Sequence, residues 1–196
     1  MIELREISVS FGDNRVLERL SDRWPDCGTV VLRGASGSGK TTLLRVLCGL
    51  LRPDAGCVTG LKRRRVSVVF QEDRLLPWRT ALENVALVSD ERTARELLAR
   101  LDLAQAMDGR PDALSGGMRR RVAMARALAY SDDVLLLDEP FTGLDAVRRD
   151  AAAALIRERA KLIVVATHDE TEAALLGATH WLTLPAQAAP ADAERP

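Results

Sequence analysis

The chain has 196 residues, which is enough for one domain with a sizeable core. Lysine and arginine together number 28, as do aspartate and glutamate, so the formal net charge is zero. This balance gives no support to a nucleic-acid partner. The short basic runs at 62–65 and 119–121 are expected to be solvated, because no aromatic residues are interleaved with them.

The cysteines and the amino-terminal residues indicate the cellular compartment in which the chain works. The three cysteines, Cys27, Cys48 and Cys57, lack metal-ligand spacing, and an odd, scattered count favours a reducing compartment. Charged residues close behind Met1 argue against a secretory signal, and no apolar run approaches the roughly 18 residues of a membrane-spanning helix. We therefore expect a cytoplasmic chain that acts at a membrane only by docking onto another protein.

Residues 2–20 are expected to form β structure. Apolar and polar residues alternate from Ile2 to Phe11, and the alternation slips its phase once, which indicates a bulge. A turn at 12–14 leads to residues 16–20, which can return as the partner strand. A second turn at 25–28 precedes the β-branched stretch 29–33, which is typical of a buried strand.

Residues 34–41 fit the phosphate-binding pattern of Gly, four residues and Gly-Lys-Ser/Thr, between the strand 29–33 and a helix expected over 42–50. The glycines let successive backbone N–H groups face an anion. Lys40 can reach the β- and γ-phosphates of a nucleoside triphosphate, and the Thr41 hydroxyl can ligate Mg²⁺. The residues predicted to bind the nucleotide here are Gly34, Ala35, Ser36, Gly37, Ser38, Gly39, Lys40, Thr41 and Thr42.

After a turn at 53–56, residues 66–70 are predicted to be a strand that ends just before Gln71. Ligands of open parallel sheets bind outside the carboxyl ends of the strands. Gln71 is therefore expected to meet the nucleotide and its metal ion, although on position alone a structural glutamine is an equal alternative.

Residues 72–130 are predicted to form a helical lobe inserted between strands, with helices over 82–88, 91–101 and 118–129. The apolar stretch 75–78 within it is either core or a docking surface. Ser115 is a natural N-cap of the last helix. Paired glycines at Gly116 and Gly117 weaken a helix start for no structural gain, and they make sense if the phosphate of another molecule approaches the backbone there.

The apolar run 134–137 predicts a central parallel strand that is buried on both faces and ends in Asp138 and Glu139. With a phosphate-binding loop upstream, we expect Asp138 beside Mg²⁺ and Glu139 as the base one step further out. A helix over 147–159 and a strand over 161–166 deliver His168 to the same sheet edge. A helix over 170–176 and a strand over 178–184 follow, and the Ala- and Pro-rich tail 185–196 is expected to be disordered.

These motifs together resemble the ATPase subunit of ABC transporters, from Phe11 to about residue 184. The motifs that carry the resemblance are the loop at 34–41, Gln71, the Leu-Ser-Gly-Gly sequence at 114–117, the acidic pair 138–139 and His168. Leu-Ser-Gly-Gly is the discriminating element, because phosphate-binding loops and acidic pairs occur in many other NTPases.

The resemblance implies an α/β fold of the P-loop NTPase class, with a RecA-like parallel sheet core. It also implies one domain, with a core of about 1–71 and 131–184, a small antiparallel β lobe and an inserted α-helical lobe at about 72–130. The segment 56–66 is short, so the antiparallel lobe should be trimmed.

In the resembling family two copies pair head to tail and hold ATP between them. The resemblance places Ser115, Gly116 and Gly117 on the γ-phosphate of the partner's ATP. It implies that Phe11 stacks on adenine, and Val16 is also predicted to contact the nucleotide. Met118 stands where glutamine usually closes the Leu-Ser-Gly-Gly motif.

The resemblance also assigns the remaining roles. Gln71 would touch Mg²⁺ and the attacking water, Glu139 would be the general base, and His168 would contact the γ-phosphate as a switch. Lys40 would assist catalysis, and Thr41 and Asp138 would hold Mg²⁺ together with Gln71. Asp145 matches the loop that crosses the dimer interface.

Residues 71–78 and 83–85 also resemble the importer branch that serves nitrate, sulfonate, taurine and related small solutes. This implies an ATPase on the cytoplasmic side of a membrane, held there by permease subunits and served indirectly by an extracytoplasmic solute-binding protein. One alternative is a soluble ABC ATPase working on ribosomes or DNA, which usually has two cassettes or a long coiled-coil insertion. Another is a P-loop kinase, which leaves 114–117 unexplained. The solute is selected by other polypeptides.

Overall fold

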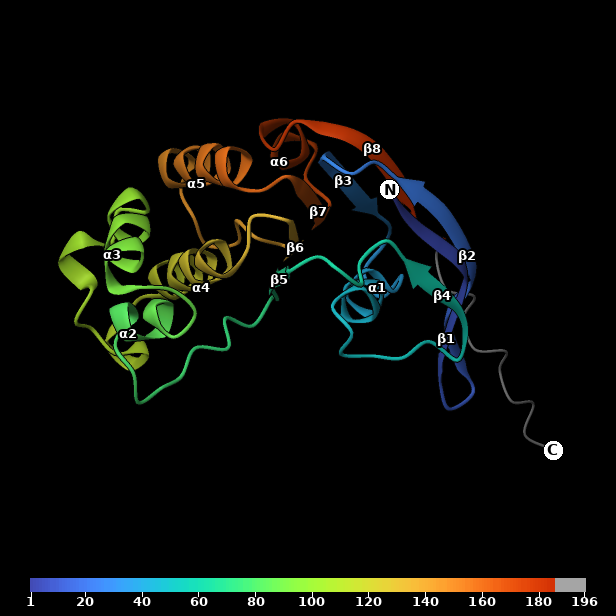
Figure 1. Cartoon of the computed structure of the whole chain (residues 1–196), viewed down its shortest axis with the longest axis horizontal. Coiled ribbons are helices and arrows are strands. Elements are labelled where there is room, and N and C mark those ends of the chain that lie inside the picture. Colours follow the sequence, from blue (N-terminus) through green and yellow to red (C-terminus); the bar gives the residue numbers. More distant parts are fainter. Residues whose placement is uncertain (186–196) are drawn as a thin grey trace.

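Two β-sheets organise the chain, and the computed structural model describes them within residues 1–185 (Figure 1). The larger sheet has five strands in the order β5-β6-β7-β3-β8, and each neighbouring pair is parallel. The smaller sheet has three antiparallel strands in the order β2-β1-β4. The strands are β1 Ile2–Phe11, β2 Asn14–Trp24, β3 Gly28–Arg33, β4 Ala55–Thr59, β5 Val66–Val69, β6 Val134–Asp138, β7 Leu162–Ala166 and β8 Ala178–Thr183.

The helices lie on both faces of the parallel sheet and in a lobe beside it (Figure 1). They are α1 Lys40–Leu47, α2 Ala81–Ala86, α3 Glu91–Arg100, α4 Gly116–Tyr130, α5 Ala146–Arg159 and α6 Glu170–Leu175. The predicted helices are all present, with ends shifted by a few residues. The predicted disorder of 185–196 falls, from residue 186 onward, outside the described residues.

The antiparallel sheet confirms the predicted hairpin and bulge and adds a strand that the sequence reading missed. The β1–β2 register shifts between Leu4 and Ile7, where the alternation of the sequence slips. Residues 53–56 are not simply a turn, because Ala55 and Gly56 open β4, which pairs with β1. A Cβ at Gly56 would lie 2.2 Å from the Arg5 carbonyl oxygen, so only glycine permits this close approach.

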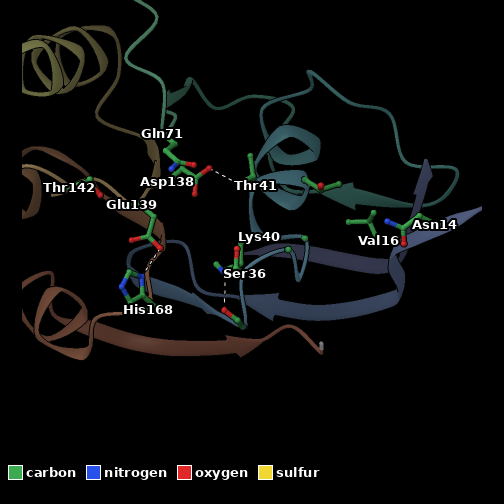
Figure 2. Close-up of a pocket in the computed structure, with 14 residues that line it drawn as sticks. Asn14, Val16, Ser36, Lys40, Thr41, Gln71, Asp138, Glu139, Thr142 and His168 are labelled. Atoms are coloured by element: carbon green, nitrogen blue, oxygen red, sulfur yellow. Dashed lines mark hydrogen bonds and ion pairs between the residues drawn. The ribbon is translucent and has the colours of Figure 1, made fainter. Parts of the chain in front are cut away.

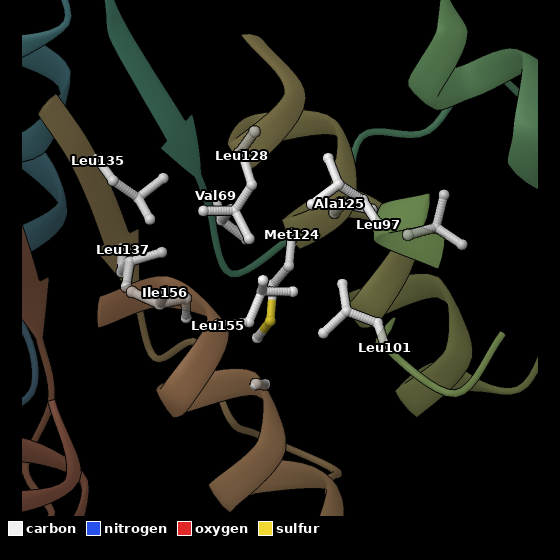
Figure 3. Close-up of a cluster of buried hydrophobic side chains, with 14 of the residues drawn as sticks. Val69, Leu97, Leu101, Met124, Ala125, Leu128, Leu135, Leu137, Leu155 and Ile156 are labelled. Carbon is white, nitrogen blue, oxygen red and sulfur yellow. The ribbon is translucent and has the colours of Figure 1, made fainter. Parts of the chain in front are cut away.

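The central strands of the parallel sheet are buried on both faces, as their apolar sequences predict, whereas the edge strand β8 is partly exposed. Successive side chains of a strand point to opposite faces. Leu135 and Leu137 of β6 face α4 and α5, while Val134 and Leu136 belong to the cluster that includes α1 and the antiparallel sheet. Figure 3 shows the first of these clusters, in which Met124 of α4 lies between the sheet side and the lobe.

The helical segment shares its core with the sheet. Leu97 and Leu101 at α3, Met124 on α4 and Leu155 on α5 belong to one continuous cluster (Figure 3). Helix α4 contacts α2, α3 and β5, so it connects the lobe to the edge of the sheet. The division into a core at 1–71 and 131–184 and a lobe at 72–130 stays a prediction. Between residues 1 and 185, no helix is long and apolar enough to cross a membrane.

One expectation about charge is wrong. The run 119–121 is not solvated, because Arg120 and Arg121 are only 3% and 5% exposed. Their guanidinium groups donate to main-chain carbonyl oxygens of distant segments, which compensates for burial of the charge. The run at 62–65 is at least partly exposed, as expected.

Candidate active site

A cavity of about 680 Å³ opens at the carboxyl ends of the parallel strands, beside the loop that follows β3 (Figure 2). Most of the predicted site residues line it: Val16, Gly34, Ser36, Gly37, Gly39, Lys40, Thr41, Thr42, Gln71, Asp138, Glu139 and His168. The structure therefore brings together segments that lie up to 152 residues apart, from Val16 to His168.

The loop 34–39 has the backbone geometry of an anion cradle. Gly37 and Gly39 have φ angles of 81° and 95°, in the left-handed region that favours glycine. A Cβ at Gly34 would lie 2.3 Å from Oγ of Ser38, which is buried beneath the loop. Helix α1 begins at Lys40 without a side-chain cap, so its first N–H groups are available to a phosphate.

Lys40 lies at the mouth of this cradle. Its Nζ atom donates hydrogen bonds to the carbonyl oxygens of Gly34 at 2.7 Å and Ala35 at 3.0 Å. These bonds hold the ammonium group over the loop, where a triphosphate would meet it. Ala35 itself is exposed at the loop and, like Ser38, does not line the cavity.

The donor set for a metal ion lies at the start of α1 and the end of β6. Thr41 Oγ1 donates to Asp138 Oδ2 at 2.7 Å, and Gln71 lies next to Asp138 (Figure 2). Burial raises the pKa of the Asp138 carboxyl, and the hydrogen bond from Thr41 opposes this shift.

These oxygen ligands suit Mg²⁺. That ion is typically held by one or two carboxylates together with the phosphates of its substrate. The oxygen atoms of Thr41, Asp138 and Gln71 therefore fit a Mg²⁺–nucleotide complex. Within residues 1–185, no group of three or more His, Cys, Asp or Glu side chains could hold a metal ion.

Glu139 and His168 form a pair across neighbouring strand ends (Figure 2). The Glu139 N–H donates to the Ala166 carbonyl of β7 at 2.9 Å, and Glu139 has a φ of 46°, which strains a non-glycine residue and aims its side chain into the cavity. His168 Nδ1 lies 3.0 Å from Glu139 Oε1. The hydrogen bond with this carboxylate raises the pKa of His168.

The far end of the cavity is formed by the β1–β2 hairpin, with Asn14 and Val16 (Figure 2). Phe11 does not line the cavity; it is 51% exposed and pairs in register with Asn14. Its stacking on adenine stays a prediction. The sequence reading missed Asn14 and Thr142, and the turn signal at 12–14 was the available pointer to the first of them.

Ser115, Gly116 and Gly117 lie at the amino end of α4 and do not line the cavity of their own chain. Ser115 is the N-cap, as predicted, and its Oγ accepts a hydrogen bond from the Met118 N–H at 3.3 Å. The expectation that neither glycine has a structural reason is wrong for Gly117. A Cβ there would lie 2.9 Å from the Gly143 carbonyl oxygen, whereas a Cβ at Gly116 would meet only the end of the Arg119 side chain.

Comparison with known proteins agrees with this geometry. The family described as "ABC transporter" matches residues 17–142. The chain is 40% identical over 188 residues to the aliphatic sulfonates import ATP-binding protein SsuB of Zymomonas mobilis, covering 89% of this chain and 78% of the relative. It is 42% identical over 184 residues to the protein of that name in Granulibacter bethesdensis, covering 90% and 76%.

Solved structures give the same result. A dimeric ATP-binding cassette in a post-hydrolysis state, bound to ADP and Pi, superposes with a TM-score of 0.83 at 28% identity, covering 94% of both chains. A dimeric structure of a bacterial ABC transporter cassette superposes with a TM-score of 0.81 at 29% identity, again covering 94% of both chains. The chain therefore belongs to the ABC transporter family as one of its Mg²⁺-dependent, ATP-hydrolysing cassettes.

Proposed function

We propose that the chain drives an importer of aliphatic sulfonates and that it hydrolyses ATP as a head-to-tail dimer on membrane permease subunits. The observation that carries the dimer is the incomplete site: the cavity holds the phosphate cradle and the acidic pair, while 115–117 lie outside it. A second copy can supply these residues, and both solved cassettes compared here are dimeric. The sulfonate is supported by the printed names of the relatives.

In this proposal Glu139 accepts the proton of the water that attacks the γ-phosphate. His168, 3.0 Å away, holds the Glu139 carboxylate in place and contacts the γ-phosphate when ATP is bound. Lys40 and the loop N–H groups bind the phosphates. Thr41 and Asp138, with Gln71, would hold Mg²⁺, which when bound neutralises phosphate charge.

The remaining nucleotide contacts follow from the shape of the cavity. The base would lie at the hairpin end, against Val16 and Asn14, because the acidic pair occupies the opposite end (Figure 2). Phe11 would reach adenine by closing over the cavity. Ser115, Gly116 and Gly117 would approach the γ-phosphate of the partner subunit's ATP, with N–H groups that α4 leaves without helical partners.

The link to transport is the segment between Gln71 and α2. Arg126 of α4 donates to the carbonyls of Asp73 and Arg74, and the Asn84 amide of α2 holds the backbone that follows. This segment presents Trp78, which is 65% exposed. A large exposed apolar side chain beside a helical lobe is suited to bind a partner helix. We place this surface against a permease on the cytoplasmic side of the membrane, with a solute-binding protein acting indirectly.

The test is to search the neighbouring reading frames for a permease and a solute-binding protein and to reconstitute the chain with them. An aliphatic sulfonate such as ethanesulfonate should stimulate ATP hydrolysis and be taken up. The Trp78→Asp variant should melt like the wild type yet fail to copurify with the permease. Leu50→Asp is the matched control, since Leu50 is similarly exposed at 63% but lies after α1.

The outcomes separate the parts of the proposal. Normal assembly of Trp78→Asp refutes the docking surface. Uptake of nitrate in place of sulfonate refutes the solute and leaves the motor role intact. Transfer of phosphate from ATP to a small acceptor would instead support the kinase reading.

A further inference from the structure

The Arg120 side chain makes a dense set of hydrogen bonds beside the active site, although Arg120 does not line the cavity. It lies in the second turn of α4 and is 3% exposed. Its guanidinium donates to the carbonyl oxygens of Phe70 and Gln71 at the end of β5, the latter at 3.2 Å. It also donates to the carbonyl oxygens of residues 138, 139 and 140 after β6, at 2.6 Å for Glu139 and 3.1 Å for Pro140.

These carbonyl oxygens lie at or just beyond the ends of the adjacent strands β5 and β6, where the hydrogen bonds between neighbouring strands stop. A planar guanidinium has five N–H donors in a fixed fork that can reach the oxygens of both strand ends at once, whereas a lysine has three donors on one nitrogen and a glutamine has two. Asp73 Oδ1, 3.4 Å from Nη1, supplies a countercharge. Burial lowers the pKa of Arg120, and this carboxylate opposes the shift.

The two segments that Arg120 joins are the ones that act on ATP in the proposed function. Gln71 and Glu139 extend from these strand ends into the cavity. At the amino end of the same helix, about one turn before Arg120, are Ser115 and Gly116, which in the proposed dimer contact the partner subunit's ATP. An α-helix is stiff over one turn, so a displacement of its amino end moves the guanidinium as well.

We infer that Arg120 is a positioning residue that couples the two ATP sites of the dimer. It sets the main chain of Glu139 and Gln71 in one protomer according to whether the amino end of α4 is engaged by the partner's ATP. The inference rests on the proposed head-to-tail dimer. It predicts that hydrolysis depends cooperatively on ATP concentration and that the cooperativity needs the Arg120 side chain.

Arg121 is the matched control. It is the next residue of α4, is 5% exposed, and donates to the carbonyl oxygens of Leu101 and Asp102 at 2.5 and 2.9 Å. These acceptors lie at the end of α3, away from the cavity. Arg121 also donates to the Gly117 carbonyl oxygen of its own helix at 3.3 Å, but only Arg120 contacts the segments that carry Gln71 and Glu139.

The experiment measures ATP hydrolysis by the full-length wild type, Arg120→Gln, Arg120→Lys and Arg121→Gln, each at the same interval below its melting temperature. Arg120→Gln should lower kcat by about 10- to 100-fold, since a displacement of about 1 Å costs up to about 100-fold. Its Hill coefficient should fall to about 1, while the affinity for ATP of the isolated chain stays within about twofold. Arg120→Lys keeps the charge and should be intermediate. Arg121→Gln should melt at a lower temperature but keep the Hill coefficient.

Equal losses of kcat in the variants at 120 and 121, or an unchanged Hill coefficient in Arg120→Lys, would overturn the inference. Arg120→Lys carries the comparison if Arg120→Gln does not fold. A wild type that hydrolyses ATP without cooperativity also overturns the coupling. A wild type that neither dimerises with ATP nor hydrolyses it would instead contradict the proposed function.

Discussion

The side chain of Asn84 holds, through hydrogen bonds, the segment that leads from the active site to Trp78. The loss of stability on its removal can be estimated from these bonds. Asn84 is fully buried in α2. Its Nδ2 donates to the carbonyl oxygens of Leu76 at 3.2 Å, Arg79 at 3.2 Å and Thr80 at 3.0 Å, and its Oδ1 accepts from the Leu76 N–H at 2.8 Å. The change we consider is Asn84→Ala.

Not all of these partners are left unpaired by the substitution. The Leu76 carbonyl also accepts from the Arg79 N–H, and the Thr80 carbonyl accepts from the Asn84 N–H, which alanine retains. The Leu76 N–H and the Arg79 carbonyl lose their Asn84 partners. Leu76 is half-buried and Arg79 is exposed, so each unpaired group costs about 1 kcal/mol, the low end of the usual range, and alanine returns about 0.5 kcal/mol of helix propensity. The free energy of unfolding should therefore fall by about 1–2 kcal/mol.

Urea unfolding measures this loss as a lower midpoint at an unchanged m value. Native-state hydrogen exchange locates it, because the Leu76 amide should lose protection while the amides of β6 lose no more than the global destabilisation. Gln105→Ala is the control, since Gln105 is exposed in the same lobe and should change the stability by less than about 0.5 kcal/mol. A midpoint shift no larger than that of the control, or a Leu76 amide that stays protected, would refute the reasoning.

The remaining predictions concern the active site and the start of α4. Glu139→Gln should bind ATP normally, lower kcat by about 100- to 10,000-fold because an amide cannot accept the proton, and give an ATP-bound dimer in light scattering; a monomer at saturating ATP would contradict this. The same variant should lower the pKa of His168, which Glu139 raises from 6.5 in the wild type, and NMR titration of the imidazole would disprove the pairing if the pKa did not move. Gly117→Ala should destabilise the chain by about 1–3 kcal/mol through its contact with Gly143, while Gly116→Ala should not, and equal melting temperatures of the two variants would count against the packing argument.

Much of the fold was predictable because local and global signals agree. The apolar, β-branched stretches are strands, and Ser115, an N-cap by type, caps α4. The meeting of Gln71, Asp138 and His168 in one cavity was predictable from one rule, because parallel strands bring their carboxyl ends to one sheet edge.

The features that the sequence did not predict share a different cause. In each case the residues that determine the structure lie far away in the sequence. Strand β4 is largely exposed and begins with Ala-Gly, so its pairing with β1 leaves little local pattern. From the sequence, Arg120 is predicted to be part of a charged surface run. In the structure the ends of β5 and β6 surround it, and its carbonyl acceptors on Phe70 and Pro140 are 50 and 20 residues away in the chain. Gly117 likewise needs Gly143 for its explanation.

The order of strands explains why Glu139 and His168 can pair. Strand β7 lies between β3, which leads to the phosphate cradle, and β6, which ends at Asp138. Neighbouring strands are about 4.8 Å apart, so the cradle and the acidic pair are separated by roughly 10 Å, which leaves room for a triphosphate. Because β7 is adjacent to β6, the residue after its end can reach Glu139, and His168 does so at 3.0 Å. Helix α1, which follows the cradle, also contacts the end of β6, because Thr41 in its first turn donates a hydrogen bond to Asp138 at 2.7 Å.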